Sequence, residues 1–155
     1  KIKYIGISIY DPKDLKVFWK DWKPDIIQVQ YNIFDRRIKT SGWLKKFKNH
    51  KIKVHIRSIF LQGLLITPKL KYPKKLNKLK KLLNYWFVWC KNNNRDPMQE
   101  CLRFSLRANI DKIIVGVYSL NQLKNLVESF KSLEMKSAHF PVRKYNRLVD
   151  PREWN

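Results

Sequence analysis

The chain has 155 residues, of which 44% are apolar and 14% aromatic, and its formal net charge is +22. This length suits one domain with a substantial core, and this composition excludes an intrinsically disordered chain. The longest clear apolar block, YWFVWC at residues 85–90, is far shorter than the roughly 18 residues of a membrane span. We therefore expect one folded domain that does not enter a membrane.

The charge comes from 25 Lys and nine Arg residues, against 12 acidic ones. Such a charge attracts phosphate backbones or an anionic membrane surface. The excess of Lys over Arg, with abundant Asn and Ile, is however what compositional drift in an AT-rich genome would produce, and the lysines are spread over nearly every predicted helix. We expect mostly solvated lysines, with nonspecific nucleic-acid binding and attraction of a smaller polyanion as alternatives. Specific nucleic-acid binding is not expected, because the sequence lacks an Arg-rich cluster and an exposed stacking platform.

The cysteines and histidines predict neither disulfides nor a metal site. Cys90 and Cys101 fall on apolar faces of predicted helices and lack CxxC spacing. The three histidines are scattered, without the clustering that metal ligands need. We expect buried thiols in a reducing cytoplasm.

In chain order, the pattern alternates between strand and helix. Residues 1–10 lack an initiator Met and enter a strand pattern at once, so we expect no signal peptide and a chain that is a fragment. Asp11 and Pro12 then open a helix over 11–22, as its cap and first residue. Further elements are predicted as strand 24–34, helix 41–50, strand 51–60, helices 73–94 and 96–109, strand 111–117, helix 119–132 and an irregular tail 137–155.

The helix over 73–94 is basic, aromatic and strongly amphipathic. We expect its apolar stripe to face the core, with a membrane-surface helix as the alternative.

Alternation within the predicted strands favours a barrel. Apolar residues of strand 24–34 alternate with Gln28, Gln30 and Asn32, and strand 51–60 alternates in the same way. A doubly wound sheet has helices on both faces and is apolar on both, whereas a barrel can keep a polar inner face near its site. We predict an α/β fold, a (βα)4 unit that forms the second half of a TIM-type (β/α)8 barrel.

Polar residues and glycines mark the carboxyl ends of these strands, where barrel sites form. Ser8, Gln28 with Asn32, Arg57 with Ser58, and Gly116 are expected to converge there. This placement explains why a guanidinium and a hydroxyl interrupt the apolar stretch KVHIRSIFLQGLL. We expect Arg57 and Ser58 to face a ligand rather than the helix layer.

Five of these stretches together resemble the second half of an aldo/keto reductase. YIGIS resembles the family's GxS strand, DIIQVQYN its Gln-bearing strand, and IRSIFLQGLL the strand and loop over the cofactor pyrophosphate. IIVGVYSLNQL resembles the last strand and following helix, and LVDPREW a closing motif of bacterial members. The resemblance covers residues 1–155 and implies a C-terminal half-barrel that binds NADP or NAD.

The resemblance also implies roles for individual residues. Ser8 and Gln28 match positions that hydrogen-bond the nicotinamide carboxamide, and Arg57 stands where an aromatic residue commonly stacks on the nicotinamide. Ser58 and the backbone from Leu61 to Gly63 match the pyrophosphate loop. The adenosine end is matched by Gly116, Val117, Gln122 and Asn125. If the matching motifs did not occur in the family's order, we would interpret Gln28 as one of several inward-facing polar residues and Gln122 as an ordinary surface residue of a helix.

The chain also departs from the family pattern at Ile9, Gln122 and Leu126. Ile9 follows Ser8 where the family often has Asn, and Leu126 stands where a further Asn is expected. Gln122 replaces the basic residue that some members use for the 2′-phosphate, which weakens any preference for NADP over NAD.

The family's catalytic Asp, Tyr, Lys and His belong to the first four βα units, which this sequence does not include. No catalytic role is therefore assigned to residues of this chain, Tyr31 and Lys53 included. The expected function is the cofactor-binding half of an aldehyde or ketone reductase, with nicotinamide dinucleotide, a carbonyl substrate and the missing N-terminal half-barrel as partners. A noncatalytic barrel remnant or regulatory homologue with nucleotide affinity is the alternative.

Overall fold

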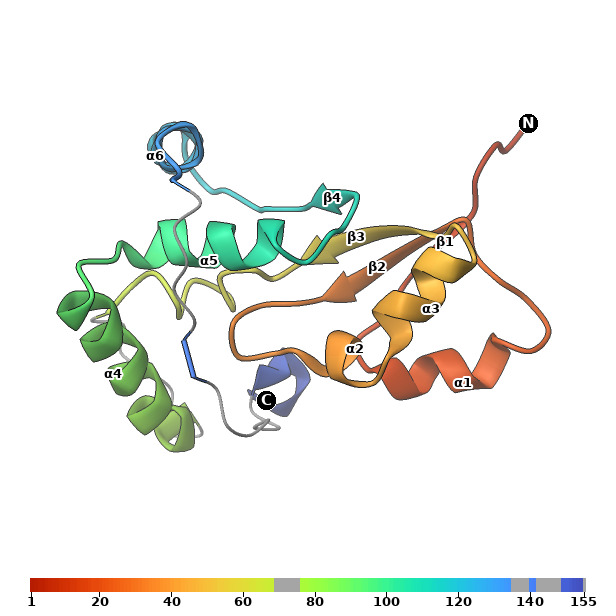
Figure 1. Cartoon of the computed structure of the whole chain (residues 1–155), viewed down its shortest axis with the longest axis horizontal. Helices are drawn as coiled ribbons and strands as arrows, with labels where there is room; N and C mark the ends of the chain where they lie inside the picture. The colour runs from red at the N-terminus through yellow and green to blue at the C-terminus, as the bar shows by residue number, and fades with distance from the viewer. Residues whose placement is uncertain (69–75, 135–139, 142–148, 155) are drawn as a thin grey trace.

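The computed structural model describes residues 1–68, 76–134, 140–141 and 149–154. Its four strands form one parallel sheet in the order β1-β2-β3-β4 (Figure 1). They are β1 (Gly6–Ser8), β2 (Ile26–Gln30), β3 (Lys53–Arg57) and β4 (Lys112–Ile113). The helical segments are η1 (Pro12–Asp14), α1 (Leu15–Phe18), α2 (Arg37–Thr40), α3 (Trp43–Asn49), α4 (Asn77–Asn92), α5 (Pro97–Leu106), α6 (Leu120–Lys131) and η4 (Pro151–Trp154).

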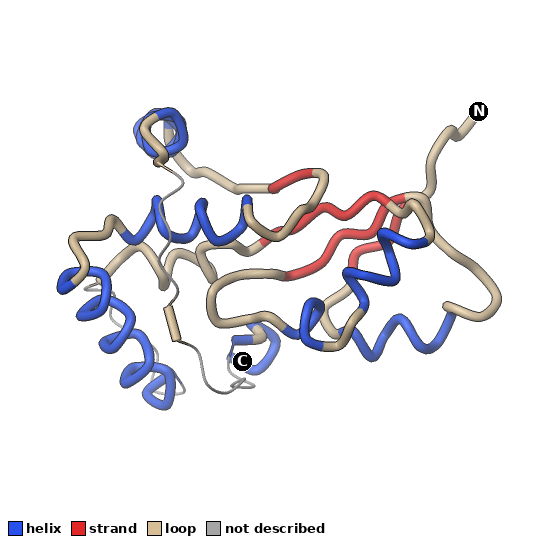
Figure 2. Tube along the Cα trace, viewed as in Figure 1, coloured by secondary structure: helices blue, strands red, loops and turns tan. Residues whose placement is uncertain are grey.

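The strand order confirms the predicted fold class. Each strand pairs with the next one along the chain, as in a barrel, whereas a doubly wound sheet reverses its order at a switch point. Figure 2 shows the four strands as one sheet in the middle of the molecule, with helices around it. The chain is thus an α/β half-barrel with two open edges, β1 and β4.

Several predicted boundaries differ from the structure. The first strand pairs only over Gly6–Ser8, and the predicted helix 11–22 divides into η1 and α1. The helix expected over 41–50 is α3, which α2 precedes, with Gly42 at φ 80° between them. The tail was expected to be irregular, but Pro151–Trp154 form the 3-10 helix η4. Residues 73–75, and 137–139, 142–148 and 155 of the tail, lie outside the described residues.

The predicted alternation in β2 and β3 is confirmed by burial. Ile27 and Val29 of β2, and Val54 and Ile56 of β3, are buried against the helices that follow them. The helices α1, α2, α3 and α5 contribute Leu15, Ile38, Trp43, Phe47 and Leu102 to the same cluster. Because successive residues of a strand face opposite sides, Ser8, Gln28, Gln30 and Arg57 lie on the face away from this layer.

A second apolar cluster lies beyond the carboxyl ends of β2 and β3. There α4 packs Leu79, Leu83 and Trp86 against the loop after β3, which contributes Leu61 and Leu65. The Trp86 indole donates a hydrogen bond to the Leu65 carbonyl at 2.9 Å, which satisfies its buried N–H. The stripe of α4 therefore faces the core, as expected. Within the described ranges, every helix is too short or too polar to cross a membrane.

Candidate functional site

The sheet pairs Ser8 with Gln28 on its polar face. The two residues are register partners in β1 and β2, and the Ser8 hydroxyl donates to Gln28 Oε1 at 2.9 Å. Ser8 is exposed and Gln28 half-buried, so both remain accessible from the open side of the sheet. Their side chains together present a hydroxyl, an amide NH₂ and an amide carbonyl, which can bind a ligand carboxamide.

Arg57 lies beside this pair, and its side chain stacks on Tyr10, a residue that the sequence analysis did not single out. Its guanidinium carbon lies 4.3 Å from the centre of the Tyr10 ring, and that of Arg152 lies 4.6 Å from it. Arg57 also donates hydrogen bonds to the Ile9 carbonyl and the Ser58 hydroxyl, both at 3.3 Å. The side chain therefore avoids the helix layer, as expected, but is covered by Tyr10. Two guanidinium groups on one ring indicate cation–π stabilisation.

The loop after β3 has an unusual backbone. Ser58, Leu61 and Gln62 have φ values of 58°, 47° and 54°, and Gly63 follows at 84°. Residues other than Gly rarely adopt this left-handed region, and such strain is often found at binding sites. The buried Asn32 holds the start of the loop, because its Nδ2 donates to the Ser58 carbonyl at 3.0 Å. Within the described part of the chain, no hydrogen-bond acceptor is found for the amides of Gln62 and Gly63.

The expected adenosine residues lie on the segment that follows β4. Gly116 has open space where a Cβ would stand, and Val117 and Asn125 are exposed. The side chain of Gln122 is already hydrogen-bonded within its own segment, since its Oε1 accepts a hydrogen bond from the Tyr118 amide at 2.8 Å. Ser119 caps the same helix by accepting from the Gln122 amide. Gln122 therefore stabilises the start of α6, and the S-x-x-Q spacing could have indicated this capping role.

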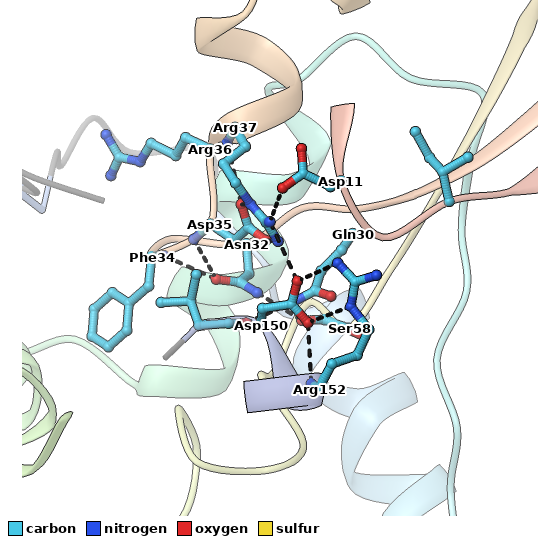
Figure 3. A network of polar contacts seen from close by, with 12 residues as sticks. Asp11, Gln30, Asn32, Phe34, Asp35, Arg36, Arg37, Ser58, Asp150 and Arg152 are labelled. Carbon is cyan, nitrogen blue, oxygen red and sulfur yellow. Dashed lines mark hydrogen bonds and ion pairs between the residues drawn. The ribbon is translucent and has the colours of Figure 1, made fainter. Parts of the chain in front are cut away.

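Figure 3 shows a charged network at the carboxyl ends of β1 and β2 that sequence reasoning missed. Arg37 contacts three carboxylates, those of Asp35 at 2.7 Å, Asp11 at 3.0 Å and Asp150 at 3.4 Å. Asp150 also binds Arg152 at 2.8 Å. Burial acts to raise the pKa of Asp150, but hydrogen bonds from Arg152 and the charges of Arg152 and Arg37 outweigh it, so this pKa is lowered.

The network fixes the C-terminal segment against the polar face of the sheet. Gln30 Nε2 donates to the Val149 carbonyl at 2.7 Å, and Val149 is fully buried. Gln30 Oε1 is buried without a hydrogen-bond partner among the described residues. The segment 149–154 therefore lies against Gln30 of the polar face, and Arg152 joins it to the ring of Tyr10, on which Arg57 also stacks.

Burial makes Tyr31 and the two cysteines poor candidates for proton transfer or nucleophilic chemistry. Tyr31 is buried and stacks on Phe104, and this burial raises its pKa to about 12. A proton-donating Tyr needs the opposite shift. Burial also raises the pKa of Cys90 to about 12 and that of Cys101 well above its ordinary value. Across the described ranges, no group of three His, Cys, Asp or Glu side chains could hold a metal ion.

A sequence model of the aldo/keto reductase family matches residues 1–141, and the chain belongs to this family. It is 27% identical over 139 residues to YqkF of Bacillus subtilis (strain 168), an uncharacterized oxidoreductase; the match covers 83% of this chain and 44% of YqkF.

Solved structures support the fold. The apo form of aldo-keto reductase AKR11C1 from Bacillus halodurans is similar with a TM-score of 0.62 and 23% identity, over 98% of this chain and 51% of that one. Glycerol dehydrogenase AKR11B4 from Gluconobacter oxydans gives a TM-score of 0.52 and 15% identity, over 93% and 54%. The chain thus spans about half the length of the relatives it matches.

Proposed function

We propose that this chain is the cofactor-binding half of an NAD(P)H-dependent oxidoreductase that reduces an aldehyde or ketone. The observation that carries the proposal is the Ser8–Gln28 pair at the carboxyl ends of neighbouring strands, in a chain of the aldo/keto reductase family. The bound dinucleotide would supply the hydride, and the residues of this chain would bind and orient it.

At the nicotinamide end, Ser8 and Gln28 would hold the carboxamide. A carboxamide carries one acceptor oxygen and two N–H donors, which match the hydroxyl and the amide of this pair. The 2.9 Å hydrogen bond between them would be exchanged for bonds to the ligand, so little new desolvation is needed. Arg57 and Tyr10 form a stacked wall beside this pair and would limit where the ring can lie.

At the phosphate end, Ser58 and the loop through Gly63 would bind the pyrophosphate. The amides of Gln62 and Gly63 have no acceptor among the described residues and stand in left-handed backbone, so they are suited to bind an anion. Gly116, Val117 and Asn125 would contact the adenosine, with no Cβ at Gly116 to obstruct it. Gln122 would contribute less than the resemblance implied, because its amide oxygen caps α6. NADP and NAD both remain compatible with these residues.

The reaction would require a partner, the N-terminal half-barrel with its catalytic Asp, Tyr, Lys and His. The open edge at β4 and α6 supports this part of the proposal. Four apolar residues with helical spacing lie exposed on α6: Leu120, Leu123, Val127 and Phe130. Four further βα units would cover this stripe, pair with the edges of β4 and β1, and close the barrel.

Titration of NADPH and NADH into the chain, alone and with the completing half-barrel, tests the proposal through the quenching of tryptophan fluorescence. We expect Gln28→Ala to weaken dinucleotide binding about tenfold, the loss expected for about 1.4 kcal/mol of hydrogen bonding. Gln99→Ala is the matched control, since it removes the same side chain from α5, where it binds Ser132. Absence of binding in both settings, or equal losses in both variants, would contradict the proposal.

A noncatalytic remnant or regulatory homologue is the second candidate. The observation in its favour is that Arg57 and Arg152 both stack on the Tyr10 ring, which takes up space beside Ser8 and Gln28. Such a protein would bind the dinucleotide without turning over a carbonyl substrate. NADPH oxidation in the presence of the completing half-barrel and an aldehyde distinguishes the two candidates.

A further inference from the structure

A lysine-lined hollow of about 530 Å³ lies at the opposite end of the strands from the candidate cofactor site. Its walls come from α3 and from the connection between α5 and β4, where Ala108 and Ile110 line it. The hollow lies at the amino ends of the strands, because its lining includes Lys53, which begins β3, and Asp111, which directly precedes β4. Ser8, Ser58 and Gly116, by contrast, stand at or beyond the carboxyl ends of their strands.

The local sequence gathers the lysines here. Lys45 and Lys48 are three residues apart on α3, so they share one face of the helix, while Trp43 and Phe47 are buried. Lys51 follows the helix in left-handed backbone, with φ at 57°. Lys39 adds a fourth ammonium group from α2. The fifth lysine, Lys53, directs its ammonium over the Tyr4 ring, 5.0 Å from its centre.

The charge of these ammonium groups is not balanced by ion pairs among the described residues. Within the described part of the chain, no carboxylate forms an ion pair with Lys39, Lys45, Lys48 or Lys51. The one acidic residue in the lining, Asp111, is engaged by the backbone, because its Oδ2 accepts from the Val54 amide at 2.7 Å. Like charges around a concave surface focus a positive potential that draws anions inward.

We propose that this hollow binds a small organic polyphosphate. Ammonium groups bind phosphate as point charges with several donors each, so they suit an anion of two or more phosphates. Leu44 and Ile52, together with Ile110, supply an apolar surface that can contact the organic part. The volume is in the range of small-molecule sites, which favours such a ligand over a nucleic-acid backbone.

The test is calorimetry of the whole chain with ATP and with inorganic triphosphate at about 150 mM salt, where dispersed surface charge is screened. The combined variant Lys45→Gln, Lys48→Gln, Lys51→Gln should weaken binding of both by about tenfold or more. The matched control is Lys80→Gln, Lys81→Gln, Lys91→Gln, which removes the same charge from α4. Figure 1 shows α4 on the opposite side of the molecule from α3. The control should bind as the parent chain does.

Three outcomes would overturn the proposal: no binding by the parent chain, equal weakening in both triple variants, or a single-stranded oligonucleotide that binds the hollow more tightly than ATP. The last would assign the site to nucleic acid. Circular dichroism of each variant establishes that it is folded. Triphosphate lacks the nicotinamide carboxamide that Gln28 would hold, so Gln28→Ala tests the dinucleotide site, the lysine triple variant tests the hollow, and either can fail alone.

Discussion

Two regions of the molecule differ in how completely their apolar residues are covered: the middle of the sheet at β2 and β3, and the helix α6 beside the edge strand β4. At β2 and β3, Ile27 and Ile56 are 0% exposed, because α1, α3 and α5 pack over them. On α6, beside the open edge, Leu123, Val127 and Phe130 are 43%, 41% and 53% exposed. Both regions carry the apolar periodicity of a buried element. The difference therefore lies in the number of neighbouring elements, since the described residues leave the apolar stripe of α6 partly exposed.

The largest expected difference between the two sides is in the free energy of unfolding. Ile56→Ala should destabilise the chain by about 3–4 kcal/mol, through lost burial and a residual cavity. Phe130→Ala, on the uncovered side, should change it by less than about 0.5 kcal/mol. Urea unfolding of both variants measures this contrast. Similar losses would mean that α6 is covered in solution by another copy or partner.

The network around Arg37, at the carboxyl ends of β1 and β2, should be nearly as costly to break as the core. Arg37→Ala leaves the carboxylates of Asp35 and Asp150 buried without their shared cation, which should cost about 3 kcal/mol. Arg152→Ala is the control, because Arg152 binds the same Asp150 but is half exposed, and should cost about 1 kcal/mol or less. Denaturant midpoints compare them, and a reversed order would contradict the assigned role of Arg37.

Acid should release the C-terminal segment before it unfolds the sheet. The pKa of Asp150 is lowered in the folded chain, so its contribution to stability is full above its ordinary pKa of 3.8. That contribution is lost as the pH falls through the lower pKa of the folded state. The fluorescence of Trp154 should report the release. In Asp150→Asn this acid-dependent step should be absent, and its persistence would assign the transition to another carboxylate.

The covered side was the more predictable one. The alternation in β2 and β3 is a property of consecutive residues, so burial of Ile27 and Val54 followed from the sequence with the correct register of faces. The order of four βα units, combined with the resemblance, also indicated the half-barrel. Ser8 and Gln28 could be placed together because the carboxyl ends of adjacent parallel strands meet.

The charged network could not be predicted in the same way. Asp11, Asp35 and Asp150 come from three distant segments, and no local spacing shows that one Arg37 will bind them all. The contact between the Arg57 guanidinium and the Tyr10 ring likewise depends on the directions of the two side chains, which the periodicity of a strand does not specify. Such contacts arise from packing among distant segments, and only the three-dimensional arrangement reveals them.

The sharpest test of the uncovered side is self-association rather than stability. Combined Leu123→Ser and Val127→Ser should change the free energy of unfolding by less than about 1 kcal/mol, because both residues are about two-fifths exposed. The same change removes apolar area from the α6 stripe, and exposed apolar patches beside an open strand edge promote association. We therefore expect the parent chain to self-associate and the double variant to do so less, as light scattering across a concentration series would measure.

Added half-barrel should suppress association of the parent chain and bind the variant more weakly. Unchanged association, together with unchanged affinity for the half-barrel, would place the contact surface elsewhere, with the bare edge of β1 as the remaining site.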